Sequence, residues 1–110
     1  METKPTMTGD FIPKHLKTNY GIETIIPDAQ HLDQNHHFVS AELTQGIFSV
    51  EAKSFFMKQM ELLKAKGAEG IILGCTELPM LIETSNFDLP MIATTYLHAQ
   101  MAADFILADY

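Results

Sequence analysis

Four consecutive residues, Gly74-Cys75-Thr76-Glu77, are the best candidates for chemistry in this sequence. They follow the short apolar run 71–73 and precede a segment with Pro79 in the first turn of an expected helix. Ligands bind at such strand-to-helix junctions in open α/β sheets, because loops converge there and helix N-termini direct positive dipoles into the crevice. We therefore expect Cys75 to ionise readily and to act as a base or nucleophile near neutral pH. The alternative is that Cys75 fills space in the core as a small hydrophobic residue.

The residues around this thiol each have two interpretations. Thr76 either caps a helix or uses its hydroxyl to hold a ligand carboxylate, and Glu77 either complements the helix dipole or orients the thiol. His98 lies in the first turn of the last expected helix and is a candidate site residue. A Cys75–His98 pair is also compatible with a thiol hydrolase, although neither residue lies in a known nucleophile signature.

The other histidines and the single cysteine argue against a metal site. His36 and His37 are adjacent, so on a helix they point about 100° apart and cannot chelate one metal from one face. Together with His31 they are expected in solvent, and His15 is expected on a helix surface. A single cysteine without a CxxC motif forms no internal disulfide and makes structural zinc improbable.

Composition limits the class of protein. With 110 residues, 46% of them hydrophobic, the chain can build one domain or part of one. Fourteen acidic residues against seven lysines, without arginine, give a net charge of −7, which disfavours nucleic acid and anionic membranes as partners. The sequence shows neither a membrane-spanning apolar stretch nor the residue order of a signal peptide, so we expect a cytoplasmic protein.

Apolar runs alternate with helix-period segments, a pattern that predicts an α/β fold with a parallel sheet flanked by helices. Strands are expected at 22–26, at 71–73 (buried on both faces) and at 89–93. Helices are expected at 8–20, 32–44, 50–66 and 76–82, followed by a closing helix. Ser49 is the expected N-cap of helix 50–66.

Two apolar stripes at helical spacing are expected to pack in the core. One consists of Phe56, Met60 and Leu63 in helix 50–66. The other, in the closing helix, consists of Leu97, Met101, Phe105 and Ala108.

Residues 67–79, GAEGIILGCTELP, resemble the second cysteine motif of the aspartate/glutamate racemase superfamily. The GCTE form is similar to the aspartate racemase branch, since glutamate racemases usually have histidine after the threonine. Three further elements resemble the family in the same order: residues 3–7 (GTxxTM), Glu42-Leu43 with Gly46 (ELxxG), and Thr94-Thr95 with His98-Ala99 (TTxxHA).

This resemblance implies a cofactor-independent racemase with two similar α/β halves, each supplying one cysteine. One thiolate removes the α-proton of an acidic amino acid, and the opposite thiol delivers a proton to the other face. It makes Cys75 the acid/base thiol. It further implies that the substrate is bound by Thr76, Thr3, Thr6 and Gln45. Glu77 and His98 are expected to support these residues without touching the substrate.

The resemblance also implies that much of the family architecture is absent. Family members are about twice this length, and the chain starts at the element that opens their second half, so residues 1–110 are interpreted as a C-terminal half. It lacks arginine and departs from the family pattern at Glu2, Gln45 and Ala93, where Gly, Lys and Asp are common. We therefore expect the isolated chain to be inactive or incomplete, and to act as a homo-oligomer or with the missing N-terminal half. The alternative is a non-catalytic fragment that acts only through self-association or partner binding.

Overall fold

A two-stranded parallel sheet lies at the centre of the fold. The structure, a computed structural model, describes residues 1–82 and 87–108. β1 (Ile71–Leu73) and β2 (Met91–Ala93) pair in parallel, with Ile72 opposite Ile92. The predicted α/β class is thus confirmed. The predicted strand at 22–26 is wrong: these residues are irregular, because Ile22 and Ile25 lie exposed on a connecting segment with no neighbouring strand in the described part of the chain.

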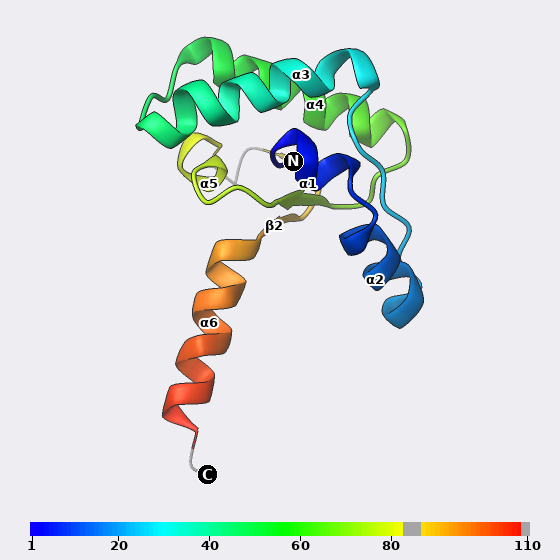
Figure 1. The fold of residues 1–110 in the computed structure, drawn as a ribbon, viewed down its shortest axis with the longest axis vertical. Coiled ribbons are helices and arrows are strands. Elements are labelled where there is room, and N and C mark those ends of the chain that lie inside the picture. The colour runs from blue at the N-terminus through cyan, green and yellow to red at the C-terminus, as the bar shows by residue number, and fades with distance from the viewer. Residues whose placement is uncertain (83–86, 109–110) are drawn as a thin grey trace.

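Helices make up most of the remaining chain (Figure 1). In order they are α1 (Lys4–Thr8), α2 (Phe11–Tyr20), α3 (Ala29–His37), the π-helical turn η1 (Phe38–Glu42), the 3₁₀ turn η2 (Leu43–Gln45), α4 (Val50–Ala65), α5 (Leu78–Leu81) and α6 (Thr94–Leu107). The expected helix 8–20 is divided because Gly9 adopts an extended conformation between α1 and α2. The helix expected at 32–44 begins earlier, at Ala29, and its C-terminal part consists of the turns η1 and η2.

The boundaries of α4 follow from its local sequence. Ser49 Oγ accepts a hydrogen bond from the Ala52 amide at 3.1 Å, which satisfies one of the free N–H groups of the first turn. Gly67, just beyond the C-terminus, has a φ of 102°, a conformation that glycine adopts without strain. The predicted N-cap is confirmed, and the helix ends at Ala65, one residue before the expected end.

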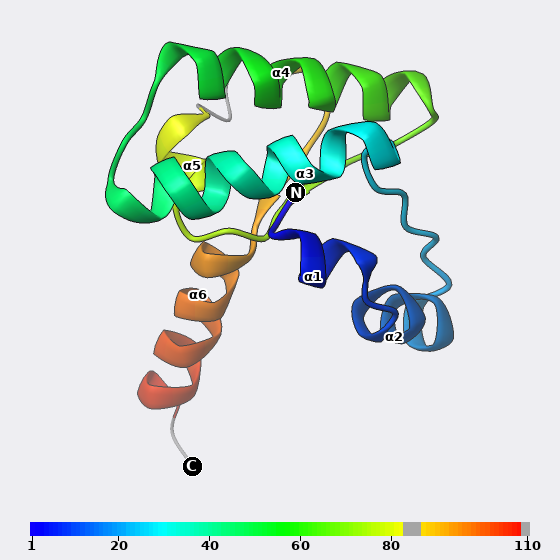
Figure 2. The ribbon, with the colours of Figure 1, turned by 45° about the horizontal axis from the view of Figure 1, so that its top comes forward.

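The core lies between the sheet and the layer formed by α3 and α4, which run side by side (Figure 2). Phe56 and Met60 of α4 are fully buried, and Phe38 contacts Phe55 and Phe56 with ring centroids 5.1 and 6.1 Å apart. The predicted core stripe of α4 is therefore confirmed. This layer covers one face of the sheet only.

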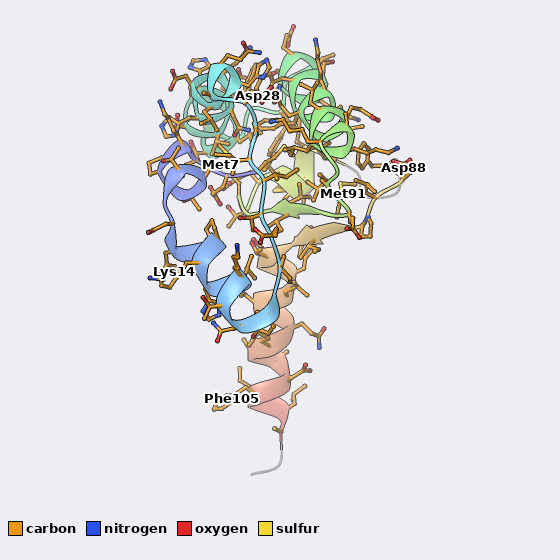
Figure 3. The ribbon with its side chains drawn as sticks, turned by 90° about the vertical axis from the view of Figure 1, so that its right-hand side faces the viewer. Met7, Lys14, Asp28, Asp88, Met91 and Phe105 are labelled. Atoms are coloured by element: carbon orange, nitrogen blue, oxygen red, sulfur yellow. The ribbon has the colours of Figure 1, made fainter. Side chains whose placement is uncertain are left out.

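In the described part of the chain, the opposite face of the sheet is partly exposed and most of the last helix is exposed. Ile72 of β1 is 37% exposed, so the expectation that this strand is buried on both faces is wrong. α6 extends away from the body, and Phe105 near its end lies far from the other labelled residues (Figures 1 and 3). Leu97 and Met101 are 52% and 70% exposed, so the expected core stripe of this helix is also wrong for this chain. The reason is that α6 continues away from the sheet after its first turn (Figure 1).

Candidate functional site

Three segments meet at the edge of the sheet where both strands end. Because β1 and β2 are parallel, Cys75 after β1 and Thr94 after β2 lie at the same edge. Thr94 Oγ1 donates a hydrogen bond to the Leu73 carbonyl oxygen at 3.4 Å, which joins the start of α6 to the end of β1. On the other side of β1, the Met1 amino group donates to the Ile72 carbonyl, and the Gly74 amide donates to the Met1 carbonyl at 2.9 Å.

Cys75 forms a thiol–carboxylate pair with Glu77. Its Sγ donates a hydrogen bond to Glu77 Oε2 at 3.0 Å, and the residue is only 5% exposed. Burial, followed by this hydrogen bond, raises the pKa of the Cys75 thiol to about 11. A hydrogen bond from the Glu77 backbone favours the thiolate but is outweighed. In this chain Cys75 is therefore a thiol at neutral pH.

This protonation state corrects the expectation from the sequence. We expected a helix N-terminus to stabilise the thiolate, but α5 is a single turn that starts at Leu78, beyond the motif. Its dipole is correspondingly weak, and removing the sulfur from water has the larger effect. The alternative interpretation, a cysteine that contributes to the core, is partly right, because Cys75 belongs to the buried cluster with Leu73 and Leu78.

Glu77 is the ionised partner in this pair. Hydrogen bonds, from Cys75 first and then from Thr76, hold the pKa of the Glu77 carboxyl below its usual value. Thr76 itself is exposed, while Glu77 is half-buried. The structure therefore places Glu77 in direct contact with the thiol.

Glu2 and Thr94 border the site in a way that sequence reasoning missed. A Cβ at Gly74 would lie only 3.0 Å from Glu2 Oε2, so the absence of a side chain at Gly74 lets residue 2 approach the loop. The Glu2 carboxylate accepts a hydrogen bond from the Thr3 amide at 2.8 Å and adds to the rise in the Cys75 pKa. The only sequence signals were the departure from the family pattern at position 2 and the presence of Thr94 in the TTxxHA element.

The other candidate residues lie around this centre at different positions. Thr3 and Thr6 are at the start of α1, and their hydroxyl oxygens are 3.1 Å apart. Gln45 ends η2 and His98 lies on α6, both with exposed side chains. Within residues 1–82 and 87–108, no hydrogen bond links Gln45 or His98 to Cys75. The Cys75–His98 hydrolase arrangement thus lacks a supporting contact.

Two hollows of the described residues lie away from the Cys75 loop. A hollow of about 420 Å³ lies against α2 beside Phe11 and His15, and another of about 250 Å³ lies between α1 and α2. Neither includes a residue of the Cys75 loop. The described residues also contain no group of three or more His, Cys, Asp or Glu side chains that could hold a metal ion, and no helix among them is long and apolar enough to cross a membrane.

Comparisons with known proteins agree with this architecture. The chain superimposes on the crystal structure of a candidate Asp/Glu racemase from Yersinia pestis with a TM-score of 0.88 and 34% identity, covering 96% of this chain and 46% of that one. An aspartate racemase homologue from Pyrococcus horikoshii OT3 gives a TM-score of 0.83 and 29% identity, covering 94% and 45%. This chain thus spans less than half the length of either structure. The Asp/Glu/hydantoin racemase family model matches residues 1–102, and the chain therefore belongs to that family.

Proposed function

We propose that this chain is the C-terminal half of a cofactor-independent amino-acid racemase and supplies one of its two proton-transfer groups, Cys75. The observation that carries the proposal is the Cys75–Glu77 pair, held at the strand-end edge of a chain that belongs to the racemase family. We propose an acidic amino acid such as aspartate as the substrate, in keeping with the Asp/Glu racemase names of both structural relatives.

The chemistry needs one proton-transfer group on each face of the α-carbon. Racemisation breaks the Cα–H bond on one side and forms a Cα–H bond on the other, so a proton acceptor and a proton donor must flank the carbon. Cys75, which is protonated at neutral pH, suits the donor: its Sγ–H would give a proton to the carbanion and become a thiolate. In the reverse direction that thiolate would remove the proton. In a mechanism with two thiols, the second cysteine has to come from outside residues 1–110, because these residues contain one cysteine.

Substrate binding would rely on neutral hydrogen-bond donors. We assign Thr76, Thr3, Thr6 and Gln45 to the oxygens of the substrate carboxylates, with Glu77 and His98 in support. The chain has no arginine for two-point binding of a carboxylate, and the Glu2 carboxylate faces the loop that follows β1. Both features weaken the binding of an amino acid with two carboxylates, so the isolated chain should not racemise aspartate at a useful rate.

The test compares the chain alone with the chain supplied with a complementary half. L- and D-aspartate turnover would be followed by polarimetry, with the remainder of the Yersinia pestis homologue co-expressed as the second half. We expect no turnover from the chain alone and measurable turnover from the mixture. Cys75→Ser should abolish the turnover of the mixture, whereas Ser54→Ala, a substitution at an exposed position of α4, should leave it unchanged. Robust Cys75-dependent turnover by the purified chain would contradict the two-half proposal, and an inactive mixture would contradict the racemase assignment.

A non-catalytic role is the second candidate. It is favoured by the uncovered face of the sheet and by the un-ionised thiol, both of which are compatible with a fragment that only binds another protein. Exchange of the aspartate α-proton in D₂O distinguishes the two: a partnered chain that binds but never exchanges this proton is a binding fragment.

A further inference from the structure

The first turn of α1 is capped by a side chain from another helix. α1 lies next to α3 (Figure 2), and His36 Nδ1 on α3 accepts a hydrogen bond from the Lys4 backbone amide at 3.1 Å. The sequence predicts His36 in solvent, whereas the structure places it, partly buried, against α1. Amide groups in the first turn of a helix have no acceptor within the helix, so an acceptor from outside must satisfy them. His36 is that acceptor for Lys4.

The same turn of α3 also holds the Lys4 side chain. Asp33 lies three residues before His36 and thus on the same face of the helix, and its Oδ1 is 2.6 Å from Lys4 Nζ. Lys4 lowers the pKa of the Asp33 carboxyl, and His36 adds a smaller effect in the same direction. The ion pair is exposed and contributes little by itself. The bond to His36 is therefore the contact that fixes the main chain at residue 4.

Capping by His36 leaves the hydroxyl of Thr3 available for another contact. Threonine at an N-cap position usually accepts a hydrogen bond from an amide of the first turn. Thr3 occupies this position in α1, but its hydroxyl oxygen lies 3.1 Å from the hydroxyl oxygen of Thr6 and caps no amide of the helix. Thr6 is exposed and Thr3 is partly exposed. The two residues thus form a hydroxyl pair that a ligand can reach.

Thr3 lies between two anchors of the main chain. Before it, the Met1 carbonyl accepts a hydrogen bond from the Gly74 amide, next to Cys75. After it, the Lys4 amide is held by His36. We propose that His36 is a positioning residue that holds the Thr3–Thr6 hydroxyl pair beside the Cys75 loop, and that protonation of His36 releases the pair. The role of this pair in binding a substrate rests on the function proposed above.

The release follows from the chemistry of the imidazole ring. Nδ1 accepts a hydrogen bond only when the ring is neutral and carries its proton on Nε2, and a second proton turns Nδ1 into a donor that faces the Lys4 N–H. The charges beside the ring in the described part of the chain act in the same direction, because an imidazolium repels the Lys4 ammonium and attracts the Asp33 carboxylate away from it. The adjacent His37 also titrates, but its ring lies against Phe38. Histidine is the side chain that ordinarily changes charge between pH 5 and 8.

The experiment uses NMR spectroscopy of the ¹⁵N-labelled 110-residue chain without substrate. It records the ring nitrogen shifts of His36, the exchange rate of the Lys4 amide with water at pH 8, and the amide signals of Thr3 and Thr6 from pH 8 to pH 5. His36→Leu removes the acceptor, and His36→Asn retains one, because the Asn Oδ1 takes the place of Nδ1. His37→Leu, an exposed position on the same helix, is the matched control.

At pH 8 we expect the His36 proton on Nε2. The Lys4 amide should exchange about fivefold faster in His36→Leu, and at the parent rate in His36→Asn and His37→Leu. On acidification, the Thr3 and Thr6 signals should follow the His36 ring in the parent chain but stay in place in His36→Asn.

Three results would overturn the proposal: a proton on Nδ1 at pH 8, equal Lys4 exchange rates in all four proteins, or Thr3 and Thr6 signals that respond to pH equally with and without His36. The ring shifts and the pH series of the parent chain need no variant, so they decide the question even where His36→Leu does not fold. Turnover is not scored, and an inactive racemase mixture would therefore contradict only the proposed function.

Discussion

The Cys75 thiol should react with alkylating agents only at strongly alkaline pH. Burial, aided by the hydrogen bond to Glu77, raises its pKa from an ordinary value of 9.0 to about 11. Two pKa units correspond to about a hundredfold less thiolate at neutral pH, and the thiolate is the reactive form. The rate of iodoacetamide labelling should therefore rise through a midpoint near pH 11 in the folded chain. Since the chain has one cysteine, mass spectrometry of the labelled product reports this residue alone.

The same chain unfolded in urea is the internal control, and its midpoint should fall near pH 9. Glu77→Gln removes the charge that opposes the thiolate, but burial is the larger cause, so the midpoint should fall by less than two units and stay above 9. Glu69→Gln makes the same change of charge at an exposed position before β1 and should leave the midpoint unchanged. A folded midpoint at or below pH 9, or equal shifts in both variants, would refute this reasoning.

The raised pKa also predicts how stability depends on pH. The folded state holds the Cys75 proton more tightly than the unfolded state, so ionisation favours unfolding. The contribution is fully present below pH 9 and is lost as the pH rises towards 11, a change of about 3 kcal/mol over the two units. Urea denaturation between pH 8 and 11 should show this slope in the parent chain and a shallower one in Cys75→Ala, whatever its starting stability. Parallel slopes in the two proteins would contradict the assigned burial effect.

Two further predictions concern the folding of α4. Ser49→Ala should lower the free energy of unfolding by about 1 kcal/mol, because the N-cap hydrogen bond is lost. Ser54→Ala, at an exposed position within the helix, should not lower it. Urea denaturation midpoints measure both variants, and equal losses would contradict the capping role of Ser49. Phe56→Ala should lower the free energy of unfolding by about 3–5 kcal/mol, because the Phe56 ring is fully buried. Val50→Ala, at the exposed start of the helix, should leave the free energy of unfolding nearly unchanged. A small effect of Phe56→Ala in thermal unfolding would mean that this core is not tightly packed.

The parts of the fold that could be predicted were those determined by neighbouring residues. The run Ile71–Leu73 is apolar and bounded by glycines, which is a local signal for a strand. Ser49 and Gly67 define the ends of α4 through their own side-chain and backbone chemistry. The predicted strand at 22–26 failed because strand formation requires a partner. Ile22 and Ile25 have the right side chains but no strand to pair with in the described residues.

The candidate site shows the same division. The GCTE motif was sufficient to locate the thiol and to suggest Glu77 as its companion, since they are only two residues apart. The approach of Glu2 to Gly74 and of Thr94 to Leu73 depends on contacts between distant segments, so the sequence order alone does not reveal them. Gln45 and His98 are motif residues that the fold of this chain leaves in solvent.

The sequence by itself determined the order of the helices and strands after Ser49, the single cysteine and its neighbours in the motif, and the resemblance to a racemase, because each of these is encoded by residue types at short spacing. Only the tertiary structure decided that this cysteine is protonated and that, among the described residues, most of α6 and part of one sheet face are exposed. The physical reason is that the pKa of a thiol and the burial of a helix both depend on what surrounds them in space. For Cys75 the surroundings are an apolar core and a carboxylate, and for α6 they are water in this chain.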